Sequence, residues 1–201
     1  MANREINRYH FPWRGGNKFR LRVDGADFFP AMLDAINQAK YFIAMEMYLV
    51  ESGAVLNQFI EALLLAARRE VKVFILLDDF GARGMQKPDR QRLQHQNIKL
   101  CFYNPLHYGR LRRVLFRDHR KLLLIDNRIA FIGGAGLSDA FHPNHAPKHY
   151  WHDVMVEIQG ACVNDWAELF IDNWPADKSD LDFFSHTTTP EDESDQAQLG
   201  R

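Results

Sequence analysis

The chain has 201 residues, of which 46% are hydrophobic and 25% charged, as is typical of a soluble globular protein. Its sequence contains no run of eighteen uncharged apolar residues, and its polar N-terminus lacks the apolar segment of a signal peptide. The two cysteines, Cys101 and Cys162, lack CxxC spacing, which argues against a disulfide framework or a thiolate metal site. We therefore expect a cytoplasmic protein.

The net charge of −1 conceals an uneven distribution. Residues 177–201 contain seven acidic and two basic residues, hence −5, which leaves +4 for residues 1–176. The acidic segment is poor in core-forming residues, and we expect a disordered tail or linker there. Six basic residues fall within 110–121, and Asp118 is the single acidic residue among them. This cluster fits either a partner that carries phosphate or a solvated charged face.

The first half of the chain alternates strand and helix patterns. Residues 19–23 alternate apolar and basic residues, as in an edge strand, and an amphipathic helix that Asp27 can cap follows at 27–40. Nearly continuous apolar runs then predict buried strands, separated by the strongest amphipathic helix. In chain order these elements are a strand at 41–50, a helix at 53–70 and a strand at 71–79.

The second half begins with a short polar helix at 87–97. It continues with strands at 98–103, 119–126, 129–134 and 154–158, and a closing helix at 162–174. A tight turn at Asp126-Asn127 makes the strands before and after it a hairpin, and hence part of the sheet antiparallel. We predict an α/β fold in which a mixed sheet lies between helices on both faces, with residues 1–176 as one domain.

The segment HRKLLLIDNRIAFIGGAG, residues 119–136, carries the chemistry. His119 and Lys121 lie two residues apart on the predicted strand, so both side chains are expected on one face. A histidine can act as nucleophile or general acid near neutral pH, and a lysine supplies positive charge for a phosphate oxygen. The glycines at 133, 134 and 136 permit close approach of backbone to a ligand.

These residues resemble the phospholipase D superfamily, whose signature is H-x-K-x(4)-D followed by a small-residue turn. His119, Lys121 and Asp126 match it, as do Gly133 and Gly134. Over roughly residues 13–175 the chain is most similar to the N-terminal half of bacterial cardiolipin synthases. The supporting segments are EMY at 46–48, LLAARREVKVFILLDDFG at 64–81 and WHDVMVEIQG at 151–160.

The resemblance implies a role for each motif residue. His119 would attack phosphorus to form a phosphohistidine, Lys121 would bind the non-bridging oxygens, and Asp153 would hydrogen-bond the other ring nitrogen of His119. Strand alternation points Asp126 to the opposite face, so we give this catalytic-motif residue a structural role. No metal ion or cofactor is implied. The candidate substrate-binding residues are Gly133, Gly134, Gly136, Ser138, Arg117 and Arg120.

The sequence departs from the family pattern in two ways. Gly136 stands where the family usually has an asparagine that helps to hold phosphate, and Ser138 is a candidate replacement. The family site also needs two motifs, because the nucleophile and the acid must flank phosphorus from opposite sides, and no second H-x-K occurs here. Either two chains pair symmetrically, or the chain is one half of a longer two-motif enzyme.

Three functions remain open. The first is a phosphatidyltransferase or phospholipase that acts on anionic phospholipid of the phosphatidylglycerol type, with peripheral contact at the inner face of the membrane. The second is a dimeric nuclease of the same superfamily, with nucleic acid as substrate. The third is a non-catalytic phosphate-binding half-domain. Apolar residues among the arginines of 110–117 favour lipid.

Other polar residues receive simpler interpretations. Asp78 and Asp79 end a buried strand, where turn or cap duty is expected. Glu46 lies in an apolar strand, and it either meets an arginine or faces the site. The histidines at 142, 145, 149 and 152 have helical spacing that would suit a metal, but Pro143 and Pro147 favour a polar loop at the mouth of the site.

Overall fold

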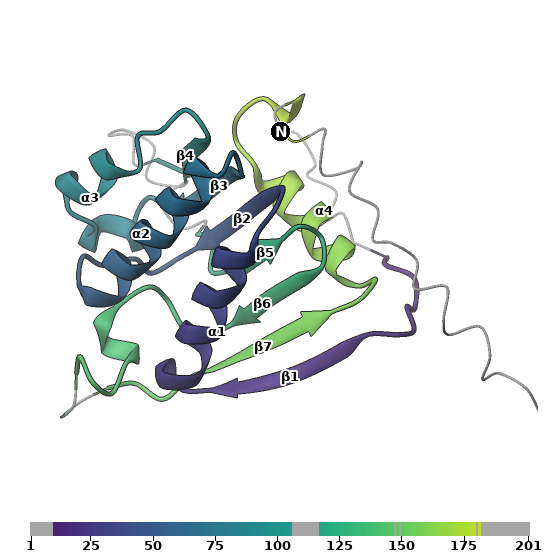
Figure 1. The fold of residues 1–201 in the computed structure, drawn as a ribbon, viewed down its shortest axis with the longest axis horizontal. Coiled ribbons are helices and arrows are strands. Elements are labelled where there is room, and N and C mark those ends of the chain that lie inside the picture. Colours follow the sequence, from purple (N-terminus) through teal and green to yellow (C-terminus); the bar gives the residue numbers. More distant parts are fainter. Residues whose placement is uncertain (1–9, 106–116, 147, 149, 180, 182–201) are drawn as a thin grey trace, which may run out of the picture.

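The computed structural model describes residues 10–105, 117–146, 148, 150–179 and 181 (Figure 1). The basic cluster at 110–113 and nearly all of the predicted tail at 177–201 lie outside the described residues. In chain order the elements are β1 (Lys18–Val23), α1 (Gly25–Gln38), β2 (Phe42–Met47), α2 (Ala54–Arg68), β3 (Lys72–Asp78), η1 (Gly81–Gly84), α3 (Lys87–Arg92), β4 (Ile98–Tyr103), β5 (Lys121–Ile125), β6 (Ile129–Gly133), η3 (Asp139–Phe141), β7 (Val154–Gln159) and α4 (Val163–Asn173).

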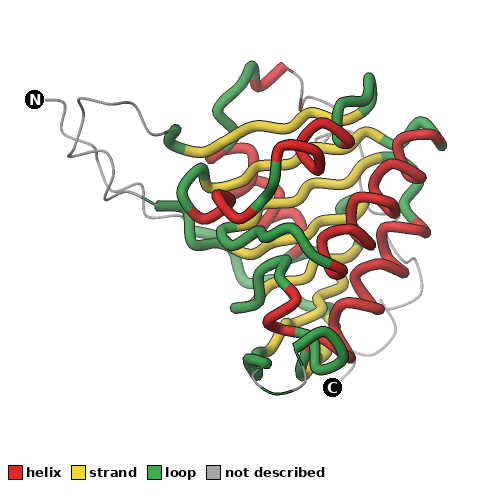
Figure 2. Tube along the Cα trace, turned by 90° about the vertical axis from the view of Figure 1, so that its left-hand side faces the viewer, coloured by secondary structure: helices red, strands yellow, loops and turns green. Residues whose placement is uncertain are grey.

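One seven-stranded sheet forms the centre, in the order β1-β7-β6-β5-β2-β3-β4 (Figure 2). Strands β2, β3 and β4 are parallel, whereas β5 pairs antiparallel with both β2 and β6, and β7 pairs antiparallel with β6 and β1. The predicted mixed α/β sheet is confirmed, and so is the hairpin. Asp126 and Asn127 have φ values of 53° and 51°, the left-handed backbone that tight hairpin turns require.

Helices cover both faces of the sheet. Apolar side chains of α1 and α2 pack on one face with the odd-numbered residues of β2, such as Met45 and Met47. Those of α4 pack on the other face with the even-numbered Phe42 and Ala44. This two-sided burial explains why β2 and β3 read as continuous apolar runs.

Two local expectations were wrong. Helix α1 begins at Gly25 with Asp24 at its N-cap position, and the Asp27 carboxylate binds Arg22 and the Val23 N–H instead. Helix α3 ends at Arg92, several residues before the predicted end. Both cysteines are free thiols. No helix in the described ranges is long and apolar enough to cross a bilayer.

Most of the strand connections lie along one edge of the sheet, formed by the ends of the strands. The carboxyl ends of β1, β2, β3, β4 and β6 meet there with the amino ends of β5 and β7, as the strand registers show. Five connections therefore leave the sheet along this edge, at residue 24 and at residues 48–53, 79–97, 104–120 and 134–153.

Candidate active site

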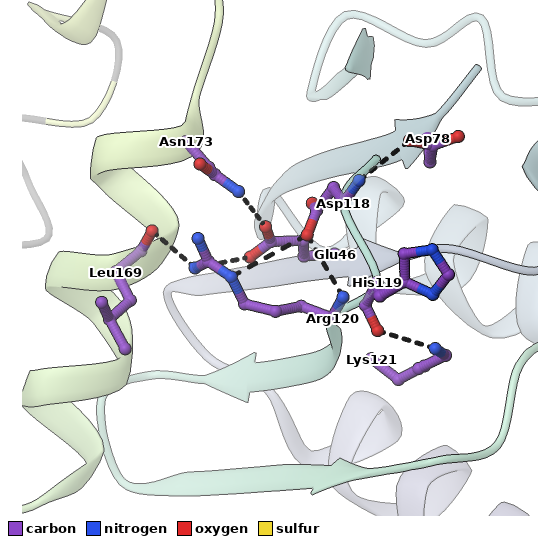
Figure 3. Close-up of polar contacts among 8 residues, drawn as sticks. All are labelled: Glu46, Asp78, Asp118, His119, Arg120, Lys121, Leu169 and Asn173. Carbon is purple, nitrogen blue, oxygen red and sulfur yellow. Dashed lines mark hydrogen bonds and ion pairs between the residues drawn. The ribbon is translucent and has the colours of Figure 1, made fainter. Parts of the chain in front are cut away.

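His119 lies at this edge, two residues before the start of β5, with an exposed side chain (Figure 3). We expected it on the strand, but β5 begins only at Lys121. β5 starts late because its partner strand β2 ends at Met47, and Met47 already pairs with Lys121. His119 therefore has no strand partner opposite it, and its ring projects beyond the sheet.

Tyr48, directly after β2, brings the two motif side chains together. Its ring stacks on the His119 imidazole with centroids 4.1 Å apart and planes 17° from parallel. The Lys121 Nζ lies 5.2 Å from the centroid of the same ring. The structure thus places an imidazole and an ammonium group beside one aromatic ring. We had not assigned Tyr48 to the site, although an aromatic residue one position beyond a buried strand was the available signal.

Lys121 is held close to the backbone of His119. Its Nζ donates a hydrogen bond to the His119 carbonyl at 2.7 Å. Partial burial lowers the pKa of Lys121, whereas the negative charges of Asp153 and Asp118 act in the opposite direction. The ammonium group therefore lies in a partly desolvated position, where its attraction for an anion is stronger than in open water.

Asp153, the residue before β7, lies near Lys121, but its carboxylate binds the backbone of the next residue. Its Oδ1 accepts a hydrogen bond from the Val154 N–H at 2.7 Å. Among the recorded contacts of the described residues, none joins its carboxylate to the His119 ring. The expected histidine–carboxylate hydrogen bond therefore stays a prediction.

The glycines of the turn approach the protein's own atoms. A Cβ atom on Gly134 would lie 2.4 Å from Asp153 Oδ1, and one on Gly133 would lie 2.2 Å from the Val154 carbonyl oxygen. A Cβ atom on Gly136 would lie 2.4 Å from the carbonyl oxygen of Leu49. Glycine is thus needed for packing at all three positions, and a phosphate contact through their N–H groups stays a prediction.

Ser138 and Asp126 serve the fold. The buried Ser138 hydroxyl donates to Glu51 Oε2 at 2.5 Å and accepts from the Ala140 N–H, which caps η3. The Asp126 carboxylate accepts three backbone N–H groups, from residues 40, 41 and 42, at 2.8–2.9 Å. Asp126 therefore fixes the start of β2, as its predicted structural role requires, and we no longer expect Ser138 to replace the missing asparagine.

The two described arginines next to the motif point away from His119. Arg120 lies on the opposite face, where its guanidinium group donates to the Leu169 carbonyl of α4 at 2.8 Å. Arg117 is nearly buried, 3.6 Å from Asp78 Oδ1 and over the Phe80 ring. We had expected both to bind substrate, and the structure instead pairs Arg117 with Asp78 and places Arg120 against Glu46 and α4. Alternation of side-chain direction accounts for Arg120, which is adjacent to His119, but not for Arg117.

Glu46, Asp118 and Asp78 form a buried acidic cluster behind His119 (Figure 3). Glu46 lies 3.4 Å from Arg120 and accepts a hydrogen bond from the Asn173 side chain, so the arginine alternative for Glu46 is confirmed. Burial raises the pKa of Glu46 to about 9, helped by a hydrogen bond with Asp118 and by its negative charge.

The histidines after η3 form a polar loop. His142 stacks on Phe29 and neighbours His145, while His152 contacts Asp24 at 3.0 Å. Partial burial, followed by the charge of His145, lowers the pKa of His142. Within the described part of the chain, no three His, Cys, Asp or Glu side chains are grouped to hold a metal ion. His149 lies outside the described residues.

A family model described as "Cardiolipin synthase, PLD-like domain" matches residues 32–169. The chain belongs to this family. The PLD-like domain is 33% identical over 169 residues to a cardiolipin synthase of Clostridium perfringens (strain 13 / Type A), and the match covers 83% of this chain but 35% of that relative. The chain therefore spans about a third of the length of this curated relative.

Solved structures share the fold of the PLD-like domain. NucT from Helicobacter pylori superposes with a TM-score of 0.63 at 17% identity, over 79% of this chain and 96% of that one. Phosphatidylserine synthase from Haemophilus influenzae Rd KW20 superposes with a TM-score of 0.62 at 17% identity, over 80% of this chain and 37% of that one. The same domain thus accounts for nearly all of one neighbour and a minor part of the other.

Proposed function

We propose that this PLD-like domain supplies one half of an active site for phosphodiester transfer or hydrolysis on phospholipids. The observation that carries the proposal is the pairing of the exposed His119 imidazole with the Lys121 ammonium group beside the Tyr48 ring. Family membership and the 33% identity to a cardiolipin synthase support phospholipid as the substrate.

His119 acts as the nucleophile in this proposal. One ring nitrogen attacks phosphorus, a nitrogen–phosphorus bond forms, and the bond to the leaving alcohol oxygen breaks. Lys121 offsets the negative charge that gathers on the non-bridging oxygens. Water or an acceptor alcohol then displaces the imidazole from the phosphohistidine and gives its proton to the group that had protonated the leaving oxygen, which is by then a base. The Tyr48 ring limits rotation of the imidazole before attack.

A second acid is needed on the far side of phosphorus to protonate the leaving oxygen. His119 cannot reach it, since the nucleophile and the leaving group lie in line on opposite sides. We propose that a second motif comes either from a partner copy or from a further half-domain of a longer chain. The coverage of 96% of NucT fits the first arrangement, and the coverage of 35% of the cardiolipin synthase fits the second.

Mixing experiments separate these two arrangements. If paired copies share the site, mixing equal amounts of wild type and His119→Ala under conditions of subunit exchange should lower the activity per wild-type chain to about one half. Mixed pairs then hold a single nucleophile. Unchanged activity per wild-type chain would contradict a shared site, and a chain inactive at every concentration would favour the missing half-domain.

The substrate class is tested directly. The purified chain is assayed on phosphatidylglycerol vesicles and on single-stranded DNA, with His119→Ala as the blank in both assays. We expect turnover of lipid and, because anionic headgroups attract basic residues, peripheral vesicle binding that weakens with salt. Turnover of DNA alone would replace the lipid proposal by the nuclease alternative. Binding without turnover in either assay would support a non-catalytic half-domain.

A further inference from the structure

The acidic cluster behind His119 has more carboxylates than cations. Glu46 and Asp78 are fully buried and Asp118 is 5% exposed. Two guanidinium groups face them in the described part of the chain: Arg117 near Asp78, and Arg120 near Glu46 and Asp118. Among the described residues, three buried acids thus meet two arginines, and this excess of buried negative charge over guanidinium groups is costly in a low-dielectric interior.

Hydrogen bonds and a neighbouring cation stabilise Asp78 in its charged form. Its Oδ1 accepts the N–H groups of Phe80 and Gly81, its Oδ2 accepts the N–H of Asp118, and Arg117 lies beside it. The surplus charge therefore falls on Glu46 and Asp118. The Arg120 guanidinium group is 3.4 Å from Glu46 Oε2 and 3.8 Å from Asp118 Oδ1, and both distances are too long for a strong hydrogen bond.

Glu46 and Asp118 lie on either side of one cation, because the Arg120 guanidinium group is 3.4 Å from Glu46 Oε2 and 3.8 Å from Asp118 Oδ1. Two neighbouring buried carboxyl groups cannot both ionise readily, and one of them then keeps a proton. No described group donates to the buried Asp118 Oδ2. A proton on the pair removes the surplus charge, and the raised pKa of Glu46 agrees with it.

The remaining groups around the pair are few. Helix α4 contributes the Asn173 amide, which donates to Glu46 Oε1 at 2.7 Å. Cys101 and Tyr103 of β4 pack partly buried against the same face of the sheet. The positive charge of Lys121 acts on Asp118 from the other side.

The pair is joined to the backbone that carries His119. Asp118 directly precedes His119, its N–H donates to Asp78 at 3.0 Å, and its Oδ1 accepts the Arg120 N–H at 3.2 Å. The peptide group that follows His119 and the peptide group that precedes Asp118 are therefore held by carboxylates. A shift of Asp118 would move the imidazole away from Tyr48 and Lys121.

We propose that Glu46 and Asp118 share one proton and that this acid–carboxylate pair is a positioning device for His119. The positioning role rests on the proposed function of His119, whereas the shared proton does not. Loss of the proton leaves two adjacent buried carboxylates, whose repulsion displaces Asp118 and with it the imidazole.

The shared proton is tested by the pH dependence of unfolding. The folded pair keeps its proton up to about pH 9, whereas unfolded Glu46 releases it near its ordinary pKa of 4.5, so rising pH favours the unfolded chain. Relative to Glu46→Gln, whose amide imitates the protonated acid, the unfolding constant of wild type should rise by about tenfold per pH unit between pH 5 and 8. Asp118→Asn should remove the same dependence.

The positioning role is tested by the NMR signals of the His119 imidazole, assigned by their loss in His119→Ala. Glu46→Ala should shift these signals and lower kcat by about ten- to a hundredfold with KM unchanged. Glu46→Gln should restore both. Glu157→Gln, which alters an ion-paired carboxylate on β7 away from the site, is the control and should leave the signals in place.

A ratio of unfolding constants that does not change with pH would overturn the shared proton. Unmoved His119 signals in a folded Glu46→Ala variant would overturn the positioning role. If Glu46→Ala does not fold, the comparison uses wild type above and below pH 9, where the signals should shift in wild type and stay in Glu46→Gln. Full activity in a folded His119→Ala variant, together with the expected pH dependence of unfolding, would contradict the proposed function alone.

Discussion

The two sides of the segment 118–121 perform different tasks. His119 and Lys121 point toward the Tyr48 ring at the open edge of the sheet. Asp118 and Arg120 point toward the interior, where they contact Glu46, Asp78 and α4. Because side-chain direction alternates, four consecutive residues supply both the reactive groups and the contacts that hold them.

This difference separates residues that look alike in the sequence. Arg120 and Lys121 are adjacent cations in one basic cluster, yet Lys121 lies beside Tyr48 and Arg120 lies against Glu46 and α4. We therefore expect substitutions on the outward side to change activity with little change in stability. Substitutions on the inward side should lower stability, and they should change activity only by moving His119.

The largest expected effect is that of His119→Ala. Removal of the nucleophile should lower kcat/KM at least about a thousandfold. Because the side chain is exposed, the free energy of unfolding should change by less than about 1 kcal/mol. Thermal denaturation and the vesicle assay measure the two quantities, and a variant that keeps a tenth of the activity would exclude His119 as the nucleophile.

Lys121→Met and Arg120→Met form a matched pair, because each removes one cation from adjacent positions. Lys121→Met should lower kcat/KM about a hundredfold through lost stabilisation of the phosphate oxygens. Arg120→Met should lower the free energy of unfolding by about 3 kcal/mol, since buried carboxylates lose their cation. Equal losses of activity in the two folded variants would show that the alternation does not divide the tasks.

Asp126→Asn tests the structural role of the last motif residue. An amide nitrogen cannot accept the Lys40 N–H, so the free energy of unfolding should fall by about 1–2 kcal/mol. Urea denaturation measures this loss, with Asp34→Asn on the exposed side of α1 as the control. Activity at low temperature should stay near that of wild type, and a catalytic loss like that of Lys121→Met would speak against a purely structural role.

The smallest expected effect concerns Tyr48. Tyr48→Leu removes the ring that contacts His119 and Lys121 and should lower kcat about three- to tenfold. Tyr48→Phe keeps the ring and should be close to wild type. A large loss in Tyr48→Phe would point instead to a role for the hydroxyl group.

Much of the fold could be predicted because its signals are local. Continuous apolar runs identified the buried strands, and the Asp126-Asn127 turn identified the hairpin. The motif identified His119 and Lys121 as candidates because their separation of two residues is a local property. The exposed imidazole beside the ammonium group agrees with that expectation, although β5 starts two residues later than predicted.

The rest depends on contacts between distant segments. Arg120 meets α4 about fifty residues later, and Ser138 meets Glu51 from far earlier in the chain, so neither partner is visible in the motif itself. Without knowledge of these partners, a basic or hydroxyl side chain near a glycine turn looked available for substrate. Tyr48 was missed for the same reason, because its importance follows from the pairing of Met47 with Lys121.

The single sheet edge at which five connections emerge has a consequence for the divergence of related proteins. The strands fix where His119 and Lys121 stand, while the connections, such as those at 48–53 and 79–97, leave the sheet at the same edge. Insertions in these loops can alter which molecule is admitted without disturbing the buried layers beneath. Proteins with this fold can thereby acquire new substrates through changes in these loops, while the catalytic residues stay the same.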